Sequence, residues 1–388
     1  MKKYFALPVA IATLTLTAVS VAPAQAASSA AIVQTEVAAG SLLDQARDLL
    51  GADVIDAATA AAERLGLDEA PATQGAILAA LDPDDYECSP TTPLTDWVAG
   101  TITDWTQLDK VFAFAAALTN LAGYASMITP SDSRYGPNGE YSTAITHTFK
   151  HLRTFWDIES GDIRLAPMHS AILADRTAVY NTFRTVFHRS EADSAYFADL
   201  FSTWASQPKI TNHPLNSMNA YAFTGEGDPD PALAALPDQI VMGDGILQAF
   251  QAIGLADVAP EAILAHEFGH HVQYEDGLFT SELTGPEATR RTELMADAFA
   301  AYFLSHSRGA SMQWKRVRLF TQVFAGIGDC GFADPGHHGT PNQRLRSAEW
   351  AYSVVTGAPN QGHILPSLTF AQRFDAKLPD LVAPDAGN

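Results

Sequence analysis

One short stretch of the chain, ILAHEFGHHVQ at residues 263–273, places three histidines and a carboxylate among apolar residues. Polar groups in apolar surroundings cost free energy unless a partner satisfies them, and a metal ion is one such partner. His266 and His270 are four residues apart, so on a helix both imidazoles leave the same face and can hold one small ion. Glu267 lies beside His266, where its carboxylate can reach a water at the metal without ligating the metal. This is the His-Glu-x-x-His arrangement of zinc sites.

A second pair of acidic residues follows at the same spacing. Glu293 and Asp297 are four apart in TELMADAFA, and the apolar neighbours in this stretch argue against a solvated acidic face. Catalytic zinc uses three protein ligands and keeps one position open. We therefore expect Glu293 to be the third ligand of one zinc ion, and Asp297 to hold a ring N–H of a ligating histidine.

Other arrangements of these residue types are weaker candidates. A di-iron carboxylate site needs a second Glu-x-x-His pair besides Glu267 and His270, and no other Glu stands three residues before any of the 12 histidines. His271 points about 100° away from His270 on a helix, which favours packing over ligation. His147 and His151 also stand four apart, but no acid accompanies them, so an ordinary helix surface is preferred to a metal site there.

Two helices must carry these residues. The first is predicted to open at Asp257 and Pro260, which are N-terminal signals, and to include the quoted stretch. The second is predicted to begin at the capping pattern Thr284-Gly-Pro-Glu287 and to run to about His306.

The rest of the chain is predicted to be α+β and mostly helical. Residues 30–82 and 95–127 show helical spacing, and a Pro/Ser/Gly/Asn-rich break follows at 129–142. NSMNAYAFTG and PDQIVMGDG predict a strand pair, and DIRLAP is a further strand-like piece. We expect a small sheet beside the helix of the two histidines. The predicted divisions are a signal peptide at 1–26, an N-terminal helical region at 27–135, a catalytic domain at 140–375 and a flexible tail at 376–388.

The start of the chain indicates export. Lys2 and Lys3 precede the uncharged run LPVAIATLTLTAVSVAP, which ends in Ala24-Gln25-Ala26, the pattern of a secretory signal peptide cleaved after Ala26. A membrane anchor is the alternative, but Thr, Ser and Pro dilute the run and no basic flank follows. No later stretch reaches the roughly 18 uninterrupted apolar residues of a spanning helix. We expect a secreted protein with no membrane attachment after cleavage.

The net charge bears on the possible binding partners, and the cysteine content bears on disulfide formation. The formal charge of −21 repels phosphate backbones, so we do not expect nucleic acid as a partner, and solubility is the plain explanation of the acidity. In an oxidising compartment the two cysteines, Cys88 and Cys330, most simply form one disulfide. Two separate buried thiols are the alternative.

The motifs together resemble those of a known class of enzymes. HEFGHHVQ followed by TELMADAFA looks like the gluzincin metallopeptidases, whose metal helices carry HExxH and then ExxxD. NAYAF is similar to the Asn-Ala-aromatic edge strand of thermolysin-like and M48-like members. DPGHHGTPNQR resembles the closing motif of a bacterial family of neutral zinc metallopeptidases. The resemblance covers roughly residues 215–350.

This resemblance implies a zincin-like fold and a zinc endopeptidase acting on a protein or peptide. Glu267 would be the base, and Asn219 and Ala220 would contact the backbone of an extended substrate. The resemblance favours His338 as a hydrogen-bond donor to the reacting carbonyl, with His337 left open, and Asp334 could orient either. The rival hypothesis is an exported binding or scaffold protein that retains a metal site without activity.

Overall fold

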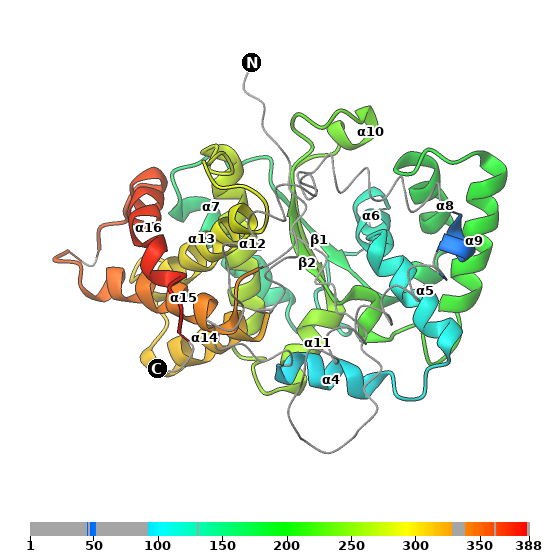
Figure 1. Ribbon diagram of the computed structural model, residues 1–388, viewed down its shortest axis with the longest axis horizontal. Coiled ribbons are helices and arrows are strands. Elements are labelled where there is room, and N and C mark those ends of the chain that lie inside the picture. The colour runs from blue at the N-terminus through cyan, green and yellow to red at the C-terminus, as the bar shows by residue number, and fades with distance from the viewer. Residues whose placement is uncertain are drawn as a thin grey trace.

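A three-stranded sheet lies at the middle of the computed structural model, with helices on both of its faces (Figure 1). The structure describes residues 45, 47–51, 92–129, 132–327, 338–360 and 362–385. Its larger helices, besides α12 and α13 described below, are α4 Pro93–Thr101, α5 Gln107–Leu118, α6 Leu121–Ile128, α7 Ser142–Phe155, α8 Arg176–Thr185, α9 Glu191–Ala205, α11 Asp244–Ala252, α14 Trp314–Ile327, α15 Pro341–Thr356 and α16 Ser367–Leu381. Short helical turns are η2 Ser170–Ala174, η3 Pro214–Ser217 and α10 Pro231–Ala234. The mostly helical α+β class is confirmed.

The sheet consists of β1 Arg164–Met168, β2 Ala220–Phe223 and β3 Gln239–Gly243, in the order β1-β3-β2. β1 runs parallel to β3, whereas β2 runs antiparallel to it. The strand pair predicted from NAYAF and QIVMG is therefore confirmed, and DIRLAP supplies the third strand. β2 is left at one edge of the sheet.

The two faces of the sheet pack against two separate hydrophobic clusters. Ile240 and Met242 belong to a cluster formed mainly by α4, α7 and α11 to α16. Val241, between them, belongs to the cluster formed mainly by α5, α6, α8 and α9. Successive side chains of a strand alternate between faces, and here both faces are covered. This explains why Ile240, Val241 and Met242 are apolar in succession instead of alternating with polar residues.

The cluster of α5, α6, α8 and α9 joins residues from both sides of the predicted boundary near 135–140. Phe112 of α5 stacks on Trp204 of α9, with ring centroids 5.3 Å apart. The N-terminal helices and the segment after the break thus share one core. No single helix of the described chain is long and apolar enough to cross a membrane; α5 and α6, bent at their junction, meet that test only as a pair.

Two long buried helices, α12 Ala259–Glu275 and α13 Pro286–Ser305, pack against each other. They belong to the hydrophobic cluster that includes Ile240 and Met242. Small residues allow the close approach. A Cβ added to Gly269 would lie 3.1 Å from both Cα and the carbonyl oxygen of Ala296. The two helices therefore pack closely through small residues.

The start of α12 differs slightly from its prediction. Pro260 lies in the first turn as expected, but Val258 precedes the helix and no side chain caps it. Asp257 instead accepts a hydrogen bond from Nε of Arg316 at 3.1 Å.

The capping pattern predicted for α13 is wrong. Gly285, with φ of 57°, occupies the position before the helix, and no side chain caps that end. Glu287 pairs with Arg290 one turn along instead of with the backbone near Thr284. A positive φ is accessible to glycine at little cost, which is why the chain enters the helix there.

The predicted signal peptide at 1–26 and both cysteines lie outside the described residues. Export and the Cys88–Cys330 disulfide stay predictions.

Candidate metal centre

Side chains from α12 and α13 converge at one buried point. His266 Nε2 lies 3.1 Å from His270 Nε2 and 3.4 Å from an oxygen of Glu293, and His270 Nε2 lies 3.5 Å from the other oxygen of Glu293. Tetrahedral zinc ligands about 2.0–2.1 Å from the ion stand roughly 3.3 Å apart. The three predicted ligands therefore form a group that could hold a metal ion.

Hydrogen bonds to the opposite ring nitrogens orient both imidazoles. His266 Nδ1 lies 2.8 Å from Oδ1 of Asp297, and His270 Nδ1 lies 2.8 Å from Oε1 of Gln273. Gln273 donates its amide nitrogen to the carbonyl of Thr292 at 2.8 Å, so its oxygen is the acceptor for His270. The proton of His270 is thereby placed on Nδ1, and Nε2 offers a lone pair.

The electrostatics of the two rings differ. Burial lowers the pKa of His270 to about 3, so this ring is neutral and suited to ligation. Burial also opposes a charge on His266, but hydrogen bonds to Asp297 and Glu293 outweigh it and raise the pKa to about 10. Glu293 is buried too, yet the charge of His338 and the hydrogen bond and charge of His266 keep its pKa well below the ordinary value. The site favours a positive charge, and a metal ion held by these residues would take the place of the proton on His266.

Arg344 on α15 binds Asp297, which in turn contacts His266. Sequence reasoning did not single out this arginine. Its Nε and Nη2 donate to the two oxygens of Asp297 at 2.8 and 2.7 Å, and the side chain is about 1 % exposed. Nη1 lies 3.8 Å from Glu293. Its signal in the sequence was the arginine that ends the motif HGTPNQR. Gln273 was also missed; it is the residue three positions after His270 in HHVQ.

Glu267 lies in the same buried space but has different contacts. The backbone N–H of Ala222, on strand β2, donates a hydrogen bond to its carboxylate. Its Oε2 is buried and has no hydrogen-bond partner among the described residues. Burial raises the pKa of Glu267 to about 7. The positive charge of His266 lowers this pKa, and the negative charge of Glu293 raises it. A carboxylate held by one oxygen with a pKa near neutrality is suited to accepting a proton.

His338 is buried close enough to the centre for its charge to lower the pKa of Glu293. Gly339, with φ of 95°, turns the chain into α15, where Thr340 and Gln343 form a reciprocal capping box. Asp334 and His337 lie outside the described residues. The structure thus brings His338 to the centre and does not test the other two.

The predicted substrate contacts lie at the start of β2. The carbonyl of Asn219 accepts the backbone N–H of Gly243 at 3.0 Å and so faces the sheet. Ala222, two residues after Ala220, directs its backbone N–H to Glu267 at the outer edge. Backbone groups of residues two apart point to the same side of a strand. Ala220 therefore presents its main-chain groups to the outer edge of the sheet. The main-chain carbonyl of Asn219 faces inward, so only the side chain of Asn219 could contact a substrate.

The remaining histidines of interest play other parts. His271 is fully buried and its Nε2 donates to the carbonyl of Gln239 at 3.1 Å, as expected of a packing residue. His147 and His151 lie side by side on α7, with ring centroids 4.3 Å apart. Among the described residues, the only group of three or more histidine, cysteine and acidic side chains positioned for a metal is His266, His270 and Glu293.

No protein-family model, curated protein or solved structure matches the chain. Its class is therefore defined by its own features: a mostly helical α+β protein with a buried His-His-Glu group that could hold a metal ion.

Proposed function

We propose that this protein is a secreted zinc peptidase in which Glu267 is the base. The observation that carries the proposal is the setting of Glu267. It follows the ligand His266 directly on α12, one of its oxygens takes the N–H of Ala222, and Oε2 has no partner in the described chain. A metal site that only binds or stabilises has no need of such a carboxylate.

The donor set supports zinc as the metal. Two imidazoles and one carboxylate are ligands that zinc accepts, and three protein ligands are the number typical of catalytic zinc. When bound, zinc supplies Lewis acidity to a water and to the scissile carbonyl. The zincin-like fold and the kinship with gluzincins, and with the neutral zinc metallopeptidases in particular, belong to the proposal. They rest on the motifs and on the small sheet beside α12.

Glu267 moves the proton in the proposed reaction. Its carboxylate takes a proton from the attacking water and passes it to the leaving nitrogen of the peptide. A pKa of about 7 allows both steps near neutral pH, because the group then gives and takes a proton with similar ease. The hydrogen bond from Ala222 holds the carboxylate in one orientation while it does so.

Strand β2 aligns the substrate. An extended peptide would pair as an added strand with the outward N–H and C=O of Ala220, in the mode called β-augmentation. The amide side chain of Asn219 would bind the neighbouring peptide group. Because Ala222 on the same edge contacts Glu267, a peptide paired along β2 runs past the base.

His338 would act on the reacting carbonyl. It is buried, and its charge acts on Glu293, so it lies within electrostatic reach of the ligands. A hydrogen bond from its ring to the carbonyl oxygen would stabilise the negative charge that develops there. His337 stays an alternative for this role, with Asp334 as the group that would orient either ring.

The rival function is an exported binding or scaffold protein that keeps a metal site without activity. If this rival is correct, replacing Glu267 should leave the function of the protein unchanged. The buried, partly unpaired Glu267 argues against it, because burying a carboxylate without a full set of partners costs free energy that a scaffold has no reason to keep.

The test is hydrolysis of casein by the purified protein, with metal content measured on the same sample. We expect one zinc per chain, loss of hydrolysis with a chelator and recovery on adding zinc. Stoichiometric zinc without any cleavage of casein or of a mixed peptide library would favour the rival function.

A further inference from the structure

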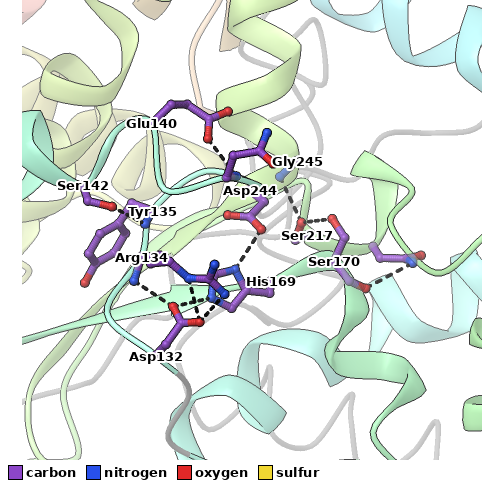
Figure 2. A network of polar contacts seen from close by, with 12 residues as sticks. Asp132, Arg134, Tyr135, Glu140, Ser142, His169, Ser170, Ser217, Asp244 and Gly245 are labelled. Carbon is purple, nitrogen blue, oxygen red and sulfur yellow. Dashed lines mark hydrogen bonds and ion pairs between the residues drawn. The ribbon is translucent and has the colours of Figure 1, made fainter.

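A set of polar contacts ties three chain segments together at the end of the sheet where β1 and β3 finish (Figure 2). His169 follows β1 directly and Asp244 follows β3 directly. Nδ1 of His169 lies 2.8 Å from Oδ2 of Asp244, whose side chain is only 6 % exposed. Parallel strands end at the same edge of a sheet, so this contact closes the edge between them.

The neighbouring serines extend the set to the segment that enters β2. Oγ of Ser170 lies 2.6 Å from Oγ of Ser217, and the backbone N–H of Gly245 donates to Ser217 Oγ at 2.9 Å. Ser217 is the last residue of η3, two residues before Asn219. We call His169, Ser170, Ser217 and Asp244 the sheet-edge clasp.

Two glycines let residues 214–219, which lead into β2, lie directly against the turn from β3 to α11. A Cβ added to Gly245 would lie 1.8 Å from the carbonyl oxygen of Pro214. A Cβ added to Gly243 would lie 2.1 Å from that of Ser217 and 2.4 Å from that of Asn219. The segment before β2 is thus packed closely against this turn, and Ser217 of the clasp also bonds to Gly245 within it.

The start of β2 matters because its outer edge faces the base. Ala222 donates its N–H to Glu267, and Ala220 presents its main chain on the same edge. We infer that the sheet-edge clasp positions β2 for substrate pairing, so that it governs the binding of extended peptides and not the chemical step. This inference rests on the proposed function, which supplies the substrate.

The charges around His169 favour its protonated form. Asp244 faces Nδ1, and Oδ1 of Asp132 lies 3.3 Å from Nε2, with Arg134 bonded to the other oxygen of Asp132 (Figure 2). The hydrogen bond to Asp244 raises the pKa of His169 above its ordinary value, against the effect of burial. When His169 is protonated, its contact with Asp244 is an ion pair, which is stronger than a bond between neutral groups.

The experiment compares His169→Gln and Ser217→Ala with His188→Gln. His188 lies 2.8 Å from Asp230 and so makes a matched histidine–aspartate contact away from the clasp. We expect both clasp variants to raise KM for a long peptide about fivefold to tenfold with kcat nearly unchanged, the effect of one lost hydrogen bond to a binding element. A short peptide that does not reach β2 should be cleaved as by the wild type, and His188→Gln should change neither value.

Hydrogen–deuterium exchange at residues 219–223 gives a readout that does not need activity. The clasp variants should exchange faster there than the wild type, and His188→Gln should not. Unchanged exchange, or an equal loss of activity on long and short peptides, overturns the inference. A wild-type protein without chelator-sensitive hydrolysis overturns the proposed function instead, and the exchange data then still decide whether the clasp holds β2.

Discussion

Arg344 holds Asp297 through two parallel hydrogen bonds inside the protein, Nε to Oδ2 at 2.8 Å and Nη2 to Oδ1 at 2.7 Å. The oxygen Oδ1 also faces Nδ1 of His266 at 2.8 Å. One carboxylate thus links a residue of α15 to a metal-ligand candidate on α12, and the orientation of the ring depends on a helix that contributes no ligand.

The first prediction concerns this link. Arg344→Lys keeps the charge but loses the two-pronged geometry, so zinc affinity should fall about 10–100-fold in a competition titration with a chelator. Arg344→Ala leaves Asp297 buried without its cation and should lower the free energy of unfolding by about 3–5 kcal/mol. The control is Arg346→Lys. Arg346 lies on α15 like Arg344 but makes a more exposed contact, with Asp385, so this change should alter zinc affinity little. Equal affinities in Arg344→Lys and the wild type would contradict this role.

The second prediction concerns the base. Glu267→Gln preserves shape and removes only the proton acceptor, so the variant should keep its zinc and lose hydrolysis by about 10²–10⁴-fold. Activity and zinc content are measured on one preparation. Glu275→Gln, at the exposed end of the same helix, serves as the control. A zinc-loaded Glu267→Gln protein with most of its activity would show that another group is the base.

A third prediction separates a ligand from its support. Glu293→Ala should lose both zinc and activity, whereas Asp297→Ala should retain a site whose affinity is weakened about 10–100-fold. Zinc content after dialysis distinguishes them. Full occupancy in the Glu293 variant would move the third ligand to another residue, with His337 or His338 next in line.

The pH dependence follows from Glu267, whose pKa is raised to about 7 by burial. Only the ionised form accepts a proton, so kcat/KM should fall about tenfold per unit as the pH drops below that value. Because the folded-state pKa lies above the ordinary 4.5, ionised Glu267 costs stability, and this cost develops as the pH rises from 4.5 to about 7. In metal-stripped protein, Glu267→Gln should therefore raise the melting temperature at pH 8 but hardly at pH 4. A flat rate profile down to pH 5 would argue against this assignment.

The fifth prediction tests the contact between the metal helices. Gly269→Ala places a Cβ 3.1 Å from the backbone of Ala296, so α12 and α13 must separate slightly, which should destabilise the protein by about 1–2 kcal/mol and weaken zinc binding. Gly326→Ala, also helical, meets nothing closer than 3.6 Å and should stabilise by about 0.5–1 kcal/mol. Calorimetry of both variants measures the difference. Similar effects from the two would mean that α12 and α13 tolerate a wider separation.

The residues that sequence alone could place are those related by local helical geometry. His266 and His270 share a face because a helix repeats every 3.6 residues, and the same rule pairs Glu293 with Asp297. The apolar runs of β2 and β3 were likewise sufficient to predict a strand pair. Spacing along one element is written directly in the sequence.

Contacts between distant elements were not predictable in the same way. Arg344 reaches Asp297 only because α15 packs on α13, and no spacing rule covers that distance along the chain. The partner of Glu267 is the backbone N–H of Ala222, a donor that every residue except proline has. The cap predicted at Thr284 failed because Gly285 takes a positive φ, which a side-chain pattern does not encode.

All four residues of β2 are buried, and the edge of the strand that faces away from β3 consists of main-chain groups. Apart from proline, which has no N–H, every residue supplies the same main-chain donor and acceptor at a position. Point mutations that preserve the fold therefore leave this edge unaltered, and the strand tolerates sequence drift without changing what it can bind. In the proposed peptidase, any preference for particular side chains must then have evolved in segments off the strand, while the ability to bind an extended chain is inherited with the sheet.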